Sequence, residues 1–300
     1  MSTGSVVAAV RSQQPLVHCI SAAVSMGIVA DGLLAAGARP MMTETVSEAP
    51  VVTTVADALL VNLGTLSTDG VEGIPATVAA AQARGVPWVL DPAAVGVAPV
   101  RTALARELLA QRPAVVRGNA SEVLVLAGQG SGGRGADSAA VSTDALDAAR
   151  QVALASGAVV AVSGTVDLLI APPTGPGSPG AARGAGTRLA RVERGSLLLT
   201  RVTGTGCLLG ALTAACTAVT DDLFLAALTA TCWIGLAGEV AASRTRRPGS
   251  YRTCLLDALD EVAETWPDDL AGVEVGDIGS DQGCQAAQRS GRPDGEERGR

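Results

Sequence analysis

Short apolar runs rich in Val, Leu and Ile alternate with longer Ala-rich segments along the first half of the chain. An uninterrupted apolar run is typical of a strand buried on both faces, and helical segments between such runs let the strands pair in parallel. The alternation therefore predicts an α/β protein with a parallel sheet covered by helices on both faces. The expected strands are 16–20, 58–62, 88–90, 114–116 and 158–162, and the expected helices lie around 24–36, 71–84, 100–110, 120–128 and 142–156.

The pattern changes after residue 163. Residues 166–170 and 188–192 are typical of a strand pair, and the Pro- and Gly-rich stretch 171–187 between them predicts a flexible excursion. Three helices are expected from residue 207 to about residue 265. The polar, Gly-rich stretch 276–300 is expected to be a disordered tail, and nothing divides the body 1–275, which we interpret as one domain.

Composition excludes several classes of function. A net charge of −7 and an aromatic content of 2% argue against a nucleic-acid partner. All 22 basic residues are Arg, so a P-loop lysine and a Schiff-base lysine are both excluded. The single histidine, His18, rules out a His-rich metal site. Because His18 lies inside an expected buried strand, we interpret it as a core residue.

The apolar helical stretches and the cysteines both favour a cytoplasmic protein without a membrane span. Residues 207–220 and 223–238 are separated by two aspartates, and each is shorter than the roughly 20 residues that a span needs. No signal peptide is apparent at the start of the chain. The six cysteines form no C-x-x-C pair, which favours reduced thiols, and Cys216 and Cys232 are expected in the core.

Polar residues follow several of the expected strands, at 62–65, 91–92, 117–119 and 163–164. In open parallel sheets, ligands bind beyond the carboxyl ends of the strands. These four positions therefore predict a polar ligand site at one edge of the sheet.

The segment Gly204-Thr205-Gly206-Cys207 leads directly into an apolar helix. Backbone N–H groups at such a start can form a cradle for an anion such as a phosphoryl group. Cys207 would lie in the first turn, where the helix dipole can lower a thiol pKa. The alternative is a glycine-rich turn with a small buried cysteine, which composition alone favours in a chain with 36 glycines.

Asp91 and Glu122 follow two different strands and could hold magnesium together with a substrate phosphate. Ordinary helix capping is the alternative, because Asn119 and Glu122 have the spacing of a capping box, and both roles can hold together. Met42 could pack against an apolar ligand, but core filling is the default for methionine.

Eight stretches of the chain are, in order, PLVHCI, LLAAGARPMM, ALLVNLGTL, PWVLDPAAVG, VVRGNASEVLVLAG, GGRGADS, VTGTGCLLGAL and RPGSYRTCLLDAL. Together they resemble hydroxyethylthiazole kinases, the thiamine-salvage enzymes of the ribokinase-like superfamily. The resemblance covers residues 14–262 with a less clear part at 171–195. It implies a three-layer ribokinase-like fold, and phosphorylation of 4-methyl-5-(2-hydroxyethyl)thiazole by ATP with Mg²⁺, in a homotrimer with interfacial active sites.

The resemblance also implies roles for individual residues. Arg117 and Ser163 match nucleotide-contacting positions, and we place Asn119 with them as ATP-binding. Asp91 and Glu122 match the acidic residues near the magnesium. The remaining matches are Met42, Gly64 and Gly204 around the thiazole, Gly204, Thr205 and Gly206 in the anion-hole turn, and Cys207 at the position where most ribokinase-like enzymes have a catalytic Asp.

One departure from the family concerns the acceptor. The family usually has Thr-Asn after VHCI, where this chain has Ser21-Ala22, and an Asn where this chain has Asp31. The resemblance implies that the first Asn helps to hold the thiazole, so Ala22 removes a donor and an acceptor. A related kinase for another small alcohol, a pyrimidine or a pyridine, therefore remains an alternative. A non-catalytic nucleotide-binding paralogue and a lyase of the same fold are further ones.

Overall fold

The computed structural model describes residues 1–130, 143–173 and 187–278, and in these residues it contains one sheet with strand order β2-β1-β3-β4-β5-β6-β7-β8-β9. The pairs from β2 to β6 are parallel, and the pairs from β6 to β9 are antiparallel. The strands are β1 Leu16–Ile20, β2 Arg39–Met41, β3 Ala58–Asn62, β4 Trp88–Asp91, β5 Val115–Asn119, β6 Val159–Ser163, β7 Asp167–Ala171, β8 Thr187–Val192 and β9 Val273–Ile278.

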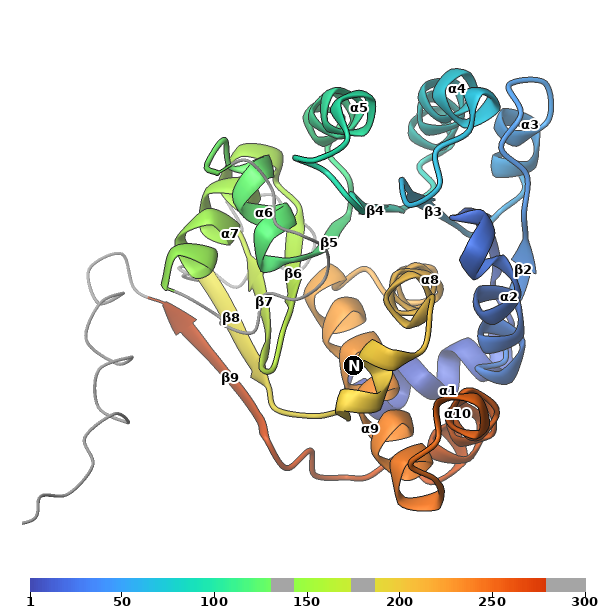
Figure 1. Ribbon diagram of the computed structural model, residues 1–300, viewed down its shortest axis with the longest axis vertical. Helices are drawn as coiled ribbons and strands as arrows, with labels where there is room; N and C mark the ends of the chain where they lie inside the picture. Colours follow the sequence, from blue (N-terminus) through green and yellow to red (C-terminus); the bar gives the residue numbers. More distant parts are fainter. Residues whose placement is uncertain (131–142, 174–186, 279–300) are drawn as a thin grey trace, which may run out of the picture.

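Helices cover both faces of this sheet (Figure 1). In β3, Leu60 joins one core cluster, whereas Leu59 and Val61 join the other, as the two-residue repeat of a strand requires. The first cluster includes residues of α1, α2, α8, α9 and α10, and the second includes residues of α4, α5, α6 and α7. The helices are α1 Thr3–Gln13, α2 Met26–Ala35, α3 Ala49–Thr53, α4 Thr68–Arg84, α5 Pro99–Ala110, α6 Ala120–Leu126, α7 Thr143–Ser156, α8 Thr205–Thr217, α9 Leu223–Arg244 and α10 Pro248–Glu264.

The predicted mostly parallel sheet with helices on both faces is confirmed, and each expected strand has its counterpart from β1 to β8. The expected start of the tail at residue 276 is wrong, because Gly276 belongs to β9, which pairs with β8. Both ends of the expected excursion 171–187 also belong to strands, β7 and β8. Its middle, residues 174–186, and the tail from 279 to 300 lie outside the described residues.

Helix α9 is long and apolar enough to cross a membrane, but 78% of its apolar window is buried inside the protein. It packs between α8 and α10, and the indole of Trp233 donates a hydrogen bond to the Leu259 carbonyl oxygen at 2.9 Å. Cys216 and Cys232 are fully buried, as expected. His18 is also a core residue. Its Nδ1 lies 2.6 Å from Thr53 Oγ1, and its Nε2 lies 2.8 Å from the Thr43 carbonyl oxygen.

Candidate active site

Four neighbouring strands carry a connected row of polar side chains near their carboxyl ends, and we call Asn62, Asp91, Arg117 and Ser163 the polar row. Asn62 Nδ2 donates to Asp91 Oδ2 at 2.7 Å, and Arg117 Nη1 lies 3.5 Å from the same oxygen. Arg117 Nη2 donates to Ser163 Oγ at 2.9 Å. The predicted site at this edge of the sheet thus has a definite geometry.

Strand register explains why these residues meet. Asn62 of β3 is paired with Asp91 of β4, and Asn119 of β5 is paired with Ser163 of β6. Because parallel strands end at the same edge, residues far apart in the sequence become neighbours there. Arg117 extends from β5, which lies between β4 and β6, and contacts Asp91 of β4 on one side and Ser163 of β6 on the other.

The charges of the polar row are buried. Burial raises the pKa of Asp91 to about 7, and Arg117 and Asn62 act in the opposite direction. Burial alone would lower the pKa of Arg117, but the negative charges of Asp91 and Glu122 outweigh it, and the net pKa is raised. The guanidinium therefore stays charged. Within the described residues, Asp91 Oδ1 and Arg117 Nε have no hydrogen-bond partner. Unpaired buried polar atoms are costly, so these two atoms indicate a binding site for a polar ligand.

The turn before α8 has the tight geometry that its glycines predict. Gly204 caps the helix with φ of +91°, and a Cβ there would lie 2.6 Å from Ile28 Cγ2 and 2.8 Å from Ser25 Cβ. A Cβ on Gly206 would lie 2.8 Å from Arg117 Nη1. The turn therefore approaches the polar row closely. Thr205 Oγ1 donates to the Leu199 carbonyl oxygen at 2.8 Å, so its hydroxyl proton is already used and only its backbone N–H is left to donate to an anion.

Cys207 lies in the first turn of α8, but the expected lowering of its thiol pKa is wrong. Burial and the nearby Asp91 charge raise the pKa of Cys207, whereas Ser25, Arg117 and Asn62 lower it less. Desolvation of the thiolate outweighs the favourable helix terminus. Cys207 is therefore mainly a thiol at neutral pH.

Asn119 and Glu122 form the capping box that their spacing predicts, at the start of α6. Asn119 Oδ1 accepts from the Glu122 N–H at 2.9 Å, and the Asn119 N–H donates to Glu122 Oε2 at 2.9 Å. Glu122 Oε1 accepts from the Ala94 N–H at 3.0 Å. Both carboxylate oxygens are thus used by the backbone, and Asp91 Oδ1 is the free acidic oxygen of the pair.

The described residues contain no group of three or more His, Cys, Asp or Glu side chains that could hold a metal ion. Magnesium usually needs only one or two carboxylates, because it keeps several waters and binds the substrate phosphates. The free oxygen of Asp91 beside Glu122 therefore fits a magnesium ion that arrives with a nucleotide.

The expected acceptor residues are only partly brought together. Gly64 donates its N–H to Asn62 Oδ1 at 2.8 Å, and a Cβ on Gly64 would lie 2.7 Å from Ala22 Cβ. Ala22 therefore lies against the loop at Gly64. Met42 follows the end of β2 and packs against the first core cluster.

Sequence reasoning missed three polar residues. The sequence shows Asn62 only as a polar residue at the end of an expected strand, and it gives no sign of Ser25, which lowers the pKa of Cys207. Asp167 accepts from the Gly164 N–H at 2.8 Å, and burial raises its pKa to about 6. Asp167 also raises the pKa of Arg117. For Asn62 and Asp167, the available signal was a polar residue at one end of an apolar strand.

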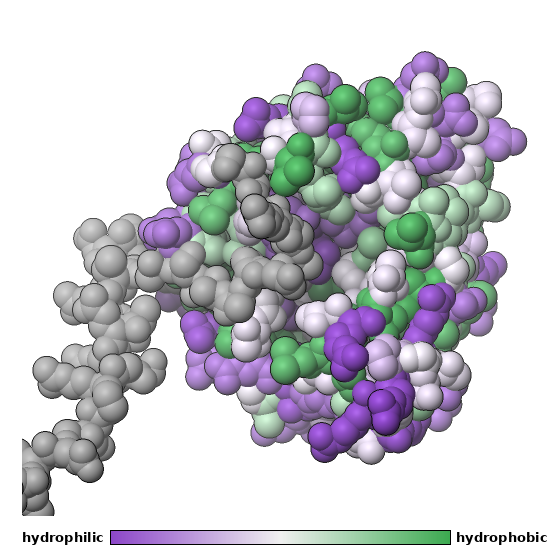
Figure 2. Space-filling model, in the orientation of Figure 1, coloured by the Kyte–Doolittle hydropathy of each residue, from purple (hydrophilic) through white to green (hydrophobic). Residues whose placement is uncertain are grey.

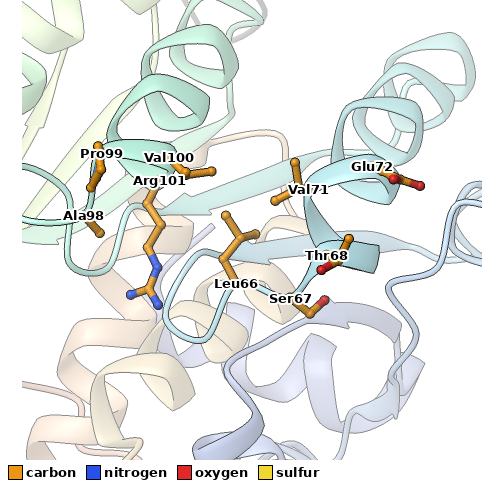
Figure 3. A pocket seen from close by; sticks show the side chains of 9 residues that line it. All are labelled: Leu66, Ser67, Thr68, Val71, Glu72, Ala98, Pro99, Val100 and Arg101. Carbon is orange, nitrogen blue, oxygen red and sulfur yellow. The ribbon is translucent and has the colours of Figure 1, made fainter.

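The surface around this edge combines a hydrophilic recess with apolar side chains. Figure 2 shows hydrophilic surface in a hollow near the place where Figure 1 labels β5. A cavity of about 400 Å³ lies beside it, between the starts of α4 and α5 (Figure 3). None of the predicted site residues lines this cavity. Leu66, Val71 and Val100 line it, and Val100 is 57% exposed.

Three comparisons place the chain among known proteins. The model of the hydroxyethylthiazole kinase family matches residues 7–265. A hydroxyethylthiazole kinase of Kineococcus radiotolerans is 47% identical over 255 residues, which are 85% of this chain and 88% of that protein. One of Cronobacter sakazakii is 44% identical over 255 residues, 85% of this chain and 91% of that protein.

Solved structures agree with this. The structure of a hydroxyethylthiazole kinase protein from Pyrococcus horikoshii is similar with a TM-score of 0.77 and 30% identity, covering 92% of this chain and 99% of that one. A pyridoxal kinase from Staphylococcus aureus in complex with ADP is similar with a TM-score of 0.59 and 14% identity, covering 88% and 98%. This second similarity concerns the fold alone.

Proposed function

The chain belongs to the hydroxyethylthiazole kinase family, and we propose that it transfers the γ-phosphoryl group of ATP to the hydroxyethyl group of 4-methyl-5-(2-hydroxyethyl)thiazole, a step of thiamine biosynthesis and salvage. The hydroxyl oxygen forms a bond to the γ-phosphorus while the bond from that phosphorus to the bridging oxygen of ADP breaks. The hydroxyl proton passes to solvent, or to Cys207 in those molecules in which its thiol is ionised. The products are thiazole phosphate and ADP.

The observation that supports this proposal best is the polar row beside the glycine turn. Phosphoryl transfer depends on positioning and on stabilising charge around the transferred group. Arg117 supplies a buried cation with one unpaired N–H, and the Gly204–Gly206 turn supplies backbone N–H groups at the start of α8. Together they can hold phosphate without any lysine. Ser163 keeps Arg117 in place, and Asn119 caps α6 beside it.

Asp91 and Glu122 would hold magnesium with the phosphates of ATP, and the ion would neutralise phosphate charge when bound. Asp91 contributes its free Oδ1, and Glu122 contributes negative charge from a carboxylate whose oxygens are bonded to the backbone. Asp91 Oδ2 remains with Asn62 and Arg117. We expect Asp91→Asn to lower turnover more than it changes binding of the thiazole.

The acceptor would lie by Gly64, Gly204 and Met42, with its hydroxyl toward Cys207. As a raised pKa leaves Cys207 mainly protonated, it can accept a proton only in the ionised fraction of molecules. The contribution of Cys207 as a base is therefore modest compared with the charge stabilisation by Arg117 and the turn.

A second candidate is a kinase of the same fold for another small alcohol. Ala22 favours it, because it lies against Gly64 and offers no polar atom of its side chain to a thiazole. A non-catalytic nucleotide-binding protein is a third candidate. The unpaired atoms of Asp91 and Arg117 fit nucleotide binding with or without catalysis, so they do not favour this candidate over a kinase.

An ATP-consumption screen tests all three readings. The purified chain is assayed with thiazole alcohol, hydroxymethylpyrimidine, pyridoxal and buffer alone, each with magnesium and with EDTA. We expect ADP formation with thiazole alcohol and magnesium. An Arg117→Ala variant is the matched inactive control, because it removes the buried cation. Turnover with only the pyrimidine or pyridoxal supports the second reading, and ATP binding without any turnover supports the third.

The proposal includes a homotrimer with active sites between subunits, in the cytoplasm. Exposed apolar side chains support an interface at the cavity, because Val71 and Val100, which line it, are 38% and 57% exposed. Val97, which directly precedes a lining residue in the sequence, is 66% exposed. Light scattering measures the mass. A mass near that of one chain in a sample with full activity would contradict the trimer and the interfacial sites.

A further inference from the structure

Both ends of the Asn62 side chain are engaged, and each contacts a different part of the site. Its Oδ1 accepts from the N–H of Gly64 at 2.8 Å, and its Nδ2 donates to Asp91 Oδ2 at 2.7 Å. The residue is only 3% exposed. Gly64 belongs to the acceptor side of the proposed site, and Asp91 belongs to the phosphate side. Asn62 therefore links the two halves through a single planar amide.

The surroundings leave this link little freedom. Asn62 is paired in register with Asp91 in the centre of the sheet, so the two strands cannot shift relative to each other without breaking the ladder. The loop at Gly64 is held between Asn62 and Ala22, because a Cβ on Gly64 would lie 2.8 Å from Asn62 Oδ1 and 2.7 Å from Ala22 Cβ. A loop packed this closely follows the position of the amide.

Directional hydrogen bonding makes asparagine the suitable residue. Its amide nitrogen only donates and its amide oxygen only accepts, so a single orientation satisfies the Asp91 carboxylate and the Gly64 N–H together. That orientation commits Asp91 Oδ2 to Asn62 and Arg117 and leaves Oδ1 as the unpaired oxygen. The amide thus determines which Asp91 oxygen is left without a hydrogen bond.

We propose that Asn62 is a positioning residue that fixes the acceptor loop at Gly64 relative to Asp91, so that the acceptor alcohol and the phosphate-binding groups keep one relative geometry. The inference rests on the proposed kinase function. It differs from a purely structural role, in which Asn62 would only satisfy buried polar atoms. A structural role affects the amount of folded protein, whereas positioning affects the kinetics of the folded enzyme.

Two substitutions separate the two bonds. Asn62→Ala removes both, and Asn62→Asp keeps the size and the oxygen that accepts from Gly64 but loses the N–H donor toward Asp91. The control is Ser67→Ala. Ser67 ends the same loop as the N-cap of α4, and its Oγ accepts from the Gly70 N–H at 2.8 Å. Each variant is measured for its thermal midpoint, for kcat, and for KM of the alcohol and of ATP.

We expect kcat to fall by about 10-fold or more in both Asn62 variants, because small misplacements at a reacting centre are costly in rate. The KM of the alcohol should rise several-fold in Asn62→Ala and less in Asn62→Asp, which retains the Gly64 bond. The KM of ATP should stay within about twofold in both. Calorimetric binding of the alcohol without nucleotide should show the same order of affinities.

Kinetics like wild type in either folded Asn62 variant would overturn the inference. So would a loss of kcat that Ser67→Ala matches at an equal loss of thermal stability. If Asn62→Ala does not fold, Asn62→Asp decides alone. Failure of wild type to phosphorylate any alcohol in the screen would overturn the proposed function instead, so the two failures are distinguishable.

Discussion

Two glycines in one turn should fail in different ways when each receives a methyl group. Gly204 has a φ of +91°, which costs an alanine about 1–2 kcal/mol. Its new Cβ would also lie 2.6 Å from Ile28 Cγ2 in the core, and overpacking of this kind costs about 1–3 kcal/mol. Gly204→Ala should therefore lose about 3 kcal/mol of unfolding free energy, which lowers the melting temperature by about 6–12 °C.

Gly206→Ala is the contrasting change. Gly206 lies within α8 and has no positive φ, so alanine is tolerated by the backbone and even gains some helix propensity, up to about 1 kcal/mol. The Cβ would lie 2.8 Å from Arg117 Nη1, which is the far end of a long side chain. Arg117 can move, but it then gives up its positions beside Asp91 and Ser163. We expect a smaller drop in melting temperature than in Gly204→Ala, because the gain in helix propensity offsets part of the loss at Arg117. The KM for ATP should rise about 10-fold or more, the scale of one lost charge-assisted contact.

The assay combines thermal melts with initial-rate kinetics at varied ATP. Gly249→Ala is the control, because a Cβ on this residue of α10 meets nothing within 4 Å. It should match wild type in both measurements. A Gly204→Ala melt indistinguishable from wild type would refute the argument from φ and from Ile28. An unchanged KM for ATP in Gly206→Ala would refute the closeness of the turn to Arg117.

Three further predictions concern single side chains. Cys207→Ala should lose part of the rate, by less than about 100-fold, and Cys207→Asp should remain active. Single-turnover rates test this, and a trapped phosphocysteine would contradict direct transfer. Ala22→Asn should lower the KM for thiazole alcohol several-fold, the scale of one hydrogen bond of about 0.5–1.5 kcal/mol, and weaker thiazole binding would favour another acceptor. Burial raises the pKa of Asp167 to about 6, so ionising this carboxyl in the folded protein lowers the free energy of unfolding. This destabilisation is absent below about pH 4, grows as the pH rises, and is complete above about pH 6. Asp167→Asn should therefore gain on the order of 1 kcal/mol over wild type between pH 4.5 and 7.5, measured by urea unfolding, and parallel curves would exclude this cost.

The central strands could be predicted because their residues are apolar on both faces, as in β3 between the two core clusters. The elements that were missed are the ones without that pattern. β2 contains Arg39 and Pro40, and β9 alternates exposed acidic residues with valine and glycine, so neither has a run that stands out from a loop. Helix α1 begins the chain with a short apolar stretch that periodicity alone did not assign.

The positions of the site residues could be predicted, but their couplings could not. Each member of the polar row lies at the end of a strand expected from the sequence or directly after it. That Asn62 bonds Asp91 depends on the register of two strands 29 residues apart, which only the folded sheet defines. The position of Cys207 at a helix start was equally visible, whereas burial and the charge of Asp91 decided the direction of its pKa.

The two outermost strands of the described sheet limit how copies of this chain can associate. β2 is three residues long and includes Pro40, which has no N–H to offer a neighbouring strand. At the other edge, β9 carries Glu274 and Asp277, whose side chains would repel the same strand of a second copy. Short, proline-bearing and acidic edges oppose the growth of the sheet from one molecule into the next. We therefore expect ordered assemblies of this chain to form through side-chain contacts of its helices and loops, not by pairing of strands at the edges of the described sheet.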